Sequence, residues 1–256
     1  MRFFLTITLL ATLISACGGR QPAGDVTYTE AAQLAFDEAE RAFERRDYET
    51  ARARFTGVYN AYPYSQYAAL AEFRIGDTFL RERTHARAIE AFRRFARIHP
   101  SHPLVAEAQY KIALSYVNQM PGDWFLRPPS YERDLTDTEN AHRALELFLA
   151  TYGESDFAEE AQMHLRETTS RLASYELYSA EFYTRRDNPR AAALRAQYLI
   201  DNYPNADQVP EALFLQGRAL IELGDVDQAT VPLRRLITEF PAHPLAVDAE
   251  EWLAAI

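Results

Sequence analysis

Apolar residues recur along most of this chain at intervals of three and four, the spacing that places them on one face of an α-helix. Four such segments follow one another within the first hundred residues, at 31–46, 49–61, 70–82 and 86–98. No stretch alternates apolar and polar residues strongly enough to compete as a β-strand. The pattern therefore predicts an all-α fold.

A short motif recurs where the second segment of each pair ends. It is an aromatic residue or histidine followed by proline or glycine, at Tyr62-Pro63, His99-Pro100, Tyr152-Gly153, Tyr203-Pro204 and Phe240-Pro241. The intervals are 37, 53, 51 and 37 residues, and an alanine stands nine residues after each leading residue. Proline cannot continue a helix, so the motif indicates repeated helix pairs that each end at this point.

Small and bulky residues are spaced within these units as in tetratricopeptide repeats. The second unit has Gly76 and Phe92, and the fifth has Gly217 and Leu233. The small residue lets two helices approach closely, and the bulky one fills the space between them. The chain resembles tetratricopeptide-repeat proteins, which implies a right-handed superhelical stack of about five tetratricopeptide-like helix hairpins.

We expect the repeats within a domain at 28–256. Their predicted ranges are about 30–64, 65–101, 102–154, 155–205 and 206–243, followed by a capping helix at 244–256. The third unit is longer because of an insertion between Tyr116 and Ala141, which contains two adjacent prolines and cannot be one continuous helix. The fourth is longer because its first helix is expected to run from Phe157 to Tyr183.

The N-terminus has the pattern of a secretory signal. Arg2 precedes an uncharged apolar run at 3–14, which is too short to cross a bilayer as a helix, and small residues follow. The segment from Leu13 to Cys17 resembles the bacterial lipobox. That resemblance implies cleavage after residue 16, a lipid on Cys17 and a lipidated tether at 17–27. Gly18 follows the cysteine where lipoproteins retained in the inner membrane carry Asp, so the same resemblance implies the periplasmic face of the outer membrane. An ordinary signal peptide with a chance cysteine is the alternative.

Composition and charge exclude several classes of function. The 27 Lys and Arg against 37 Asp and Glu give a net charge of -10, which argues against a general nucleic-acid binder. A single Cys excludes a disulfide within the chain and a multi-cysteine metal site. His99 and His102 have the spacing of two metal ligands, but both occupy positions that the repeat explains. We expect no enzyme activity, no metal and no cofactor apart from the lipid on Cys17.

Two groups of aromatic residues are candidates for partner binding. Phe36, Phe73 and Tyr110 stand 37 residues apart, so they form one stripe on the first helices of successive repeats. They either line a groove for an extended peptide or pack against the preceding hairpin, because stacking also needs an apolar stripe. In the insertion, Trp124 and Phe125 lie near arginines, a combination typical of interface anchors. Their alternative is to fold back onto the repeats.

Two longer segments resemble the BamD family of lipoproteins in the β-barrel assembly machine. Residues 94–103 resemble its Arg-Phe-x-Arg-x-x-Pro-x-His-Pro segment, and residues 172–183 resemble its Leu-Ala-x-Tyr-Glu-x-x-x-Ala-Glu-aromatic-Tyr segment. The insertion and the long helix also fall where that family has them. The chain departs from the family at Gly153, where proline is usual, and in its alanine-rich C-terminal end.

The resemblance implies a non-enzymatic scaffold that assembles β-barrel proteins into the outer membrane. The C-terminal repeats would bind a POTRA domain of BamA, with Arg195 facing an acidic residue there. From the residues alone, a solvated helix arginine is the preferred interpretation of Arg195, and only the resemblance assigns it to the interface. The N-terminal repeats would receive an unfolded outer membrane protein or an extended region of an accessory lipoprotein.

Two other classes of protein compete with this interpretation. A periplasmic repeat protein that coordinates cell-wall synthesis with envelope constriction usually has an N-terminal coiled coil and often lacks the lipobox. A lytic transglycosylase would need a catalytic domain, for which nothing after residue 245 leaves room. The sequence therefore favours the assembly scaffold.

Overall fold

The computed structural model describes residues 27–120 and 134–256. Every regular element in these two ranges is a helix, which confirms the all-α prediction. The helices are α1 (Tyr28–Glu44), α2 (Tyr48–Ala61), α3 (Gln66–Arg81), α4 (His85–Ile98), α5 (Val105–Val117), α6 (Thr136–Tyr152), α7 (Ala158–Arg185), α8 (Pro189–Asn202), α9 (Val209–Glu222), α10 (Val226–Glu239) and α11 (Pro244–Ala255).

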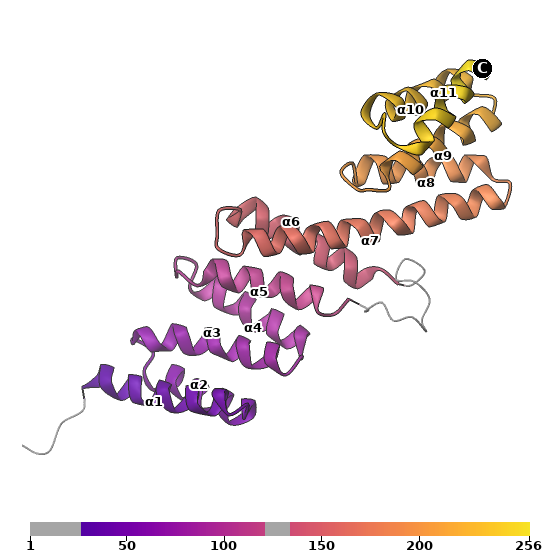
Figure 1. The fold of residues 1–256 in the computed structure, drawn as a ribbon. Coiled ribbons are helices and arrows are strands. Elements are labelled where there is room, and N and C mark those ends of the chain that lie inside the picture. Colours follow the sequence, from indigo (N-terminus) through magenta and orange to yellow (C-terminus); the bar gives the residue numbers. More distant parts are fainter. Residues whose placement is uncertain (1–26, 121–133) are drawn as a thin grey trace, which may run out of the picture.

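Each helix packs mainly against the next one along the chain, so the molecule is a linear stack of hairpins. Figure 1 shows α1 at one end and α11 at the other, with no contact between the two ends. Each predicted repeat range holds one pair, from α1 and α2 to α9 and α10, and α1 begins two residues before its range. The expected stack of helix hairpins is confirmed.

Alanines fix the distance between successive helices. The five alanines nine residues after the recurring motif are completely buried: Ala71, Ala108, Ala161, Ala212 and Ala249. Two glycines act in the same way, because a methyl group at Gly76 would lie 2.5 Å from the ring of Phe92, and one at Gly217 would lie 2.5 Å from Leu233. The small residues predicted from the repeat therefore allow the close approach of paired helices.

Helix α7 differs from the other first helices in its length of 28 residues, about 42 Å at the usual rise. Its first part, with Ala161, packs on α6, and its second part, with Ala173 and Ala180, packs on α8 and α9. Figure 1 shows it crossing the stack between the third and fifth repeats. It therefore carries the C-terminal repeats away from the N-terminal ones.

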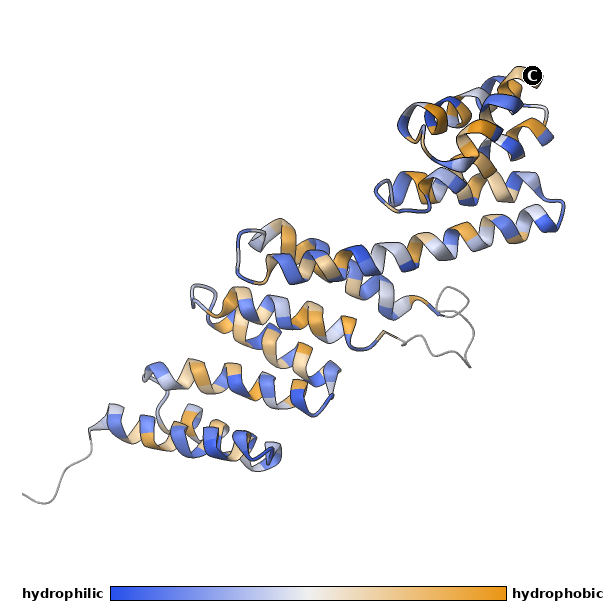
Figure 2. Ribbon diagram, viewed as in Figure 1, coloured by the Kyte–Doolittle hydropathy of each residue, from blue (hydrophilic) through white to orange (hydrophobic). Residues whose placement is uncertain are grey.

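Apolar and polar residues are mixed around every helix (Figure 2). Within the described ranges, no helix is both long and apolar enough to cross a membrane. The apolar sides of neighbouring hairpins instead meet in buried clusters, such as the one that joins Phe73, Phe92 and Phe95 to α5. The stack is therefore stabilised by contacts between adjacent repeats.

Candidate protein-binding surfaces

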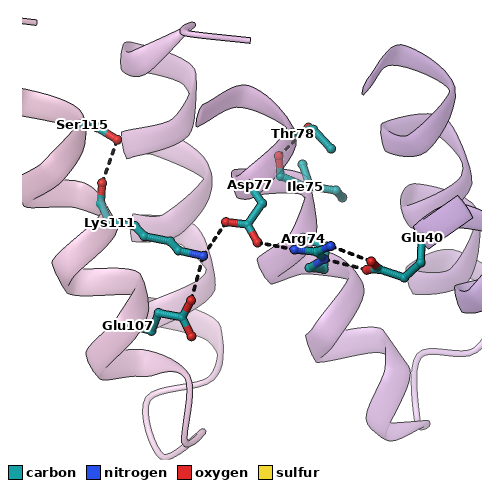
Figure 3. Close-up of polar contacts among 8 residues, drawn as sticks. All are labelled: Glu40, Arg74, Ile75, Asp77, Thr78, Glu107, Lys111 and Ser115. Carbon is teal, nitrogen blue, oxygen red and sulfur yellow. Dashed lines mark hydrogen bonds and ion pairs between the residues drawn. The ribbon is translucent and has the colours of Figure 1, made fainter. Parts of the chain in front are cut away.

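A ladder of ion pairs crosses the first helices of the first three repeats (Figure 3). Arg74 on α3 donates two hydrogen bonds to the carboxylate of Glu40 on α1, at 2.6 and 2.5 Å. It also donates to Asp77 at 2.8 Å, and Asp77 accepts a hydrogen bond of 2.6 Å from Lys111 on α5. Lys111 ends the ladder with an ion pair of 2.8 Å to Glu107.

The cations of this ladder also lie over aromatic rings. The guanidinium of Arg74 is 4.1 Å from the ring centre of Phe43, and the ammonium of Lys111 is 4.5 Å from that of Phe73. Burial of the guanidinium opposes its charge, but the carboxylates of Glu40 and Asp77 outweigh burial and raise the pKa of Arg74. The ladder therefore holds two cations against the faces of aromatic rings.

The repeat period contains the signal for this ladder. Glu40 and Asp77 stand 37 residues apart, and so do Arg74 and Lys111. Each cation therefore reaches the acidic residue at the equivalent position of the preceding repeat. The pattern is visible in the sequence when charged positions of successive repeats are compared, and small and apolar positions do not reveal it.

A hollow of about 690 Å³ opens beside the ladder. Its apolar side is formed by Phe43, Leu80 and Leu114. Arg81, Arg83, His85, Asn118 and the ladder residues Arg74, Asp77 and Lys111 form its polar side. Such a surface is suited to an extended peptide that presents both apolar and acidic groups.

The stripe of Phe36, Phe73 and Tyr110 does not line this hollow. Phe73 and Tyr110 are only 4 % and 3 % exposed, and Tyr110 stacks on Phe157 with ring centres 5.0 Å apart. Phe36 is half-buried against Phe55 and Tyr67. Stacking of the hairpins covers both side chains. Phe73 and Tyr110 therefore pack against neighbouring helices and do not line a groove for a peptide. The open surface lies two helical turns further along, at Phe43 and Leu80.

Arg195 on α8 forms an ion pair within the chain. Its guanidinium donates to the carboxylate of Glu176 on α7, with distances of 3.1 and 3.5 Å to the two oxygens. The side chain of Glu176 is 9 % exposed, whereas that of Arg195 is 42 % exposed. Burial raises the pKa of Glu176 more than the neighbouring arginine lowers it. Glu176 therefore holds one edge of the guanidinium, and the rest of Arg195 faces solvent.

Three predicted site residues, Cys17, Trp124 and Phe125, lie outside the described residues. His99 and His102 make separate contacts: His99 lies 2.6 Å from the carboxylate of buried Glu72, and His102 accepts a hydrogen bond from the Leu104 backbone. Within the described ranges, no three His, Cys, Asp or Glu side chains are placed to hold a metal ion.

Known proteins resemble this chain along most of its length. The family model for YfiO, an outer membrane lipoprotein, matches residues 29–231. The outer membrane protein assembly factor BamD of Neisseria meningitidis serogroup A is 26% identical over 260 residues, covering 97% of this chain and 95% of that protein. The protein of the same name from Xylella fastidiosa strain Temecula1 is 27% identical, covering 97% of this chain and 85% of that protein.

A protein of the same name from Caulobacter vibrioides is 24% identical and covers 97% of this chain and 79% of that protein. Among solved structures, the TPR2AB domain of yeast Sti1 aligns with 88% of this chain and 83% of its own, with a TM-score of 0.42 and 11% identity. The family match spans every helix from α1 to α9 and part of α10. The chain therefore belongs to the YfiO/BamD family of outer membrane lipoproteins.

Proposed function

We propose that this protein is a lipid-anchored, non-enzymatic scaffold for the assembly and insertion of β-barrel proteins into the outer membrane. The observation that carries the proposal is the family match over residues 29–231, which covers nearly the whole stack of hairpins. Relatives over most of the chain length are named outer membrane protein assembly factors. A linear stack with open sides is suited to holding several partners at once.

The proposed anchor is the lipid on Cys17, at the periplasmic face of the outer membrane. One acyl chain binds a membrane only reversibly, so the two or three chains of a bacterial lipoprotein would hold the protein firmly. The tether at 17–27 spans at most about 35 Å, which keeps the first repeat near the membrane. Cys17→Ser should abolish incorporation of radiolabelled palmitate, and normal labelling of the variant would contradict this anchor.

The proposed partner of the C-terminal repeats is a POTRA domain of BamA. Arg195 supports this assignment because part of its guanidinium is open to solvent while Glu176 fixes its orientation. An arginine held in this way loses little entropy when it forms a second pair of hydrogen bonds with a carboxylate. The ion pair with Glu176 also fixes the direction in which the guanidinium of Arg195 extends from α8.

The proposed ligand of the N-terminal repeats is an unfolded outer membrane protein or an extended region of an accessory lipoprotein. The hollow beside the ladder supports this, because Phe43 and Leu80 offer apolar contacts next to cationic side chains. Such a ligand would lie across the first helices of repeats one to three.

The proposal as a whole is tested by purifying the tagged full-length protein from detergent-solubilised envelope and identifying its partners by mass spectrometry. We expect BamA and other subunits of the β-barrel assembly machine. Recovery of cell-division and cell-wall enzymes without BamA would instead support the alternative, a coordinator of cell-wall synthesis and envelope constriction.

The contact at Arg195 needs a variant that leaves no buried charge unpaired. Arg195→Glu would place a second carboxylate beside Glu176, so loss of binding could reflect misfolding. We therefore compare Glu176→Gln alone with the double variant Glu176→Gln and Arg195→Gln. The two proteins differ only at Arg195, and we expect BamA to co-purify with the first and to be lost from the second. Recovery of BamA from both variants at the wild-type level would remove Arg195 from the interface.

A further inference from the structure

A second hollow, on the second helices of the stack, is lined by arginines. It has a volume of about 770 Å³ and lies between α2 and α4. The arginines that line it are Arg52, Arg87, Arg93, Arg94 and Arg97. Among the described residues that line it, Glu90 is the one acid. The hollow therefore carries a strong excess of positive charge.

Three of these arginines have no acidic partner in the described ranges. Arg52 is neutralised by Glu82 at 2.5 Å, and Arg94 lies 3.6 Å from the buried carboxylate of Glu72. Arg93 donates instead to the hydroxyl of Tyr116, and Arg87 lies over the ring of Phe79. Arg97 is exposed and makes no ion pair with the residues that the structure describes. Three cationic groups are therefore left for a ligand.

This basic surface stands out from the rest of the molecule. Residues 134–256 contain 10 basic and 22 acidic side chains, whereas residues 28–120 contain 13 basic and 12 acidic ones. Helix α4 alone carries four of those arginines against the single acid Glu90. An anionic ligand would therefore be attracted to α4 and repelled by the C-terminal repeats.

The arginine hollow continues toward the third repeat. A neighbouring hollow of about 320 Å³ lies between α4 and α6 and shares Arg93 with the first. It adds Arg143 and the 67 % exposed side chain of Leu147, and none of the described residues that line it is acidic. Apolar side chains therefore line both hollows, Phe79 in the first and Leu147 in the second. The two form one path across α2, α4 and α6.

We propose that this path binds an extended acidic segment of a partner polypeptide, with carboxylates on the arginines and apolar side chains between them. The path crosses α4, so Arg93 and Arg97, one helical turn apart on that helix, lie side by side along the path. Successive side chains of an extended chain point to opposite sides. A segment in which acidic and apolar residues alternate can therefore present carboxylates to the arginines and apolar side chains to the lining between the helices.

A polypeptide fits this path better than a membrane surface does. The apolar side chains lie in the recesses between helices, where an inserted chain reaches them and a flat layer of lipid headgroups does not. The path lies on the second helices, away from Arg195 and from the ladder on α1, α3 and α5. The proposal is therefore independent of the proposed contacts with BamA and with unfolded substrate.

The test is fluorescence anisotropy with a labelled peptide of the sequence Gly-Glu-Leu-Glu-Phe-Glu-Leu-Glu-Gly and the full chain without its signal peptide. The variant is Arg93→Gln with Arg97→Gln. The matched control is Arg190→Gln with Arg234→Gln, which removes two exposed arginines from the second helices α8 and α10. Circular dichroism checks that all three proteins are folded.

We expect the peptide to bind the wild type and the control equally, and the Arg93/Arg97 variant about tenfold more weakly. Binding should weaken as salt rises, and a peptide with Gln in place of every Glu should lose it. Equal affinity of the variant, or equal affinity for the Gln peptide, would overturn the proposal.

Two further measurements separate this partner from other occupants. Phosphatidylglycerol vesicles that sediment the wild type but not the Arg93/Arg97 variant, with no peptide binding, would assign the path to lipid and overturn the proposal. Sedimentation velocity tests whether the path instead binds a second copy of the chain through its acidic C-terminal repeats. Self-association that the variant abolishes would overturn the proposal as well, and a monomer would support it.

Discussion

Gly76 and Gly57 are both helical glycines, but a methyl group would meet opposite surroundings at the two positions. At Gly57 on α2 the added carbon would have no neighbour within 4 Å. At Gly76 on α3 it would lie 2.5 Å from the ring of Phe92, which is completely buried and packed against Phe73. The ring belongs to a buried cluster, so it can shift only by displacing its neighbours. The short distance between α3 and α4 thus depends on the absence of a side chain at position 76.

We predict that Gly76→Ala lowers the free energy of unfolding by about 1–2 kcal/mol, because overpacking outweighs the gain in helix propensity. Gly57→Ala should raise it by about 1 kcal/mol, because only the propensity gain applies. Urea denaturation followed by circular dichroism measures both. Stabilisation by both substitutions would show that the second repeat tolerates a wider helix spacing.

Glu176 makes stability depend on pH in a defined direction. Burial raises the pKa of its carboxyl in the folded protein above the value in the unfolded chain. The folded state therefore binds this proton more tightly, and stability from this group decreases as pH rises from the unfolded pKa through the folded one. A buried glutamine is neutral at every pH, so it does not incur the cost of burying a charged carboxylate. At acidic pH the protonated glutamic acid and glutamine are alike.

We therefore predict that the Tm of Glu176→Gln, relative to wild type, increases between pH 4 and pH 7. Loss of the ion pair to Arg195 shifts the Tm of the variant but does not reverse this trend, since the pKa is raised despite the arginine. Glu250→Gln, at an exposed position on α11, is the control and should run parallel to the wild type. A Tm difference independent of pH would contradict the raised pKa.

The turns inside the hairpins are built alike at the scale of the element. Arg46, Arg83, Asp187 and Gly224 occupy the same place in four repeats, and their φ values are 62°, 58°, 58° and 79°. This left-handed conformation favours glycine, and the other three residues adopt it at a cost of about 1–2 kcal/mol each. A helix end in this conformation can satisfy its last carbonyl groups. The repeats therefore keep the same left-handed turn even where the residue at this position is not glycine.

We predict that Arg46→Gly stabilises the protein by roughly 0.5–1 kcal/mol, because relief of strain exceeds the extra entropy of glycine in the unfolded chain. Gly224→Arg should destabilise the fifth repeat by about 1 kcal/mol. The Tm of each variant, measured by thermal unfolding, tests both expectations. The prediction fails if the two substitutions shift the Tm in the same direction.

Helices and their pairing could be predicted from the sequence because they depend on local rules. The three-and-four spacing and the proline stops indicate where helices run, and the buried alanines recur with the repeat. Surfaces could not be predicted in this way. Whether Phe73 is exposed depends on how far the next hairpin slides over it, and whether Arg195 is free depends on Glu176, 19 residues earlier on another helix. Such contacts are fixed only when all the helices have packed.

The whole molecule is held together by contacts between neighbouring repeats, so its stability should be local. The last helix, α11, covers the apolar side of the fifth hairpin with Leu245, Trp252 and Leu253. Nothing in the described ranges connects the two ends of the stack. In such an array the loss of one end is felt mainly by its neighbour.

We predict that deletion of residues 244–256 accelerates amide hydrogen exchange in α9 and α10 and leaves α1 to α4 unchanged. The deletion uncovers the buried cluster of Leu213, Leu233 and Leu236, and only the adjacent repeat loses contacts. Trp252→Ala is the milder variant and should produce the same pattern with a smaller amplitude if the deletion prevents folding. Exchange that accelerates equally in every helix would mean that the stack unfolds as one cooperative unit. In that case the long helix α7 would transmit stability between the two halves, because it contacts both α6 and α9.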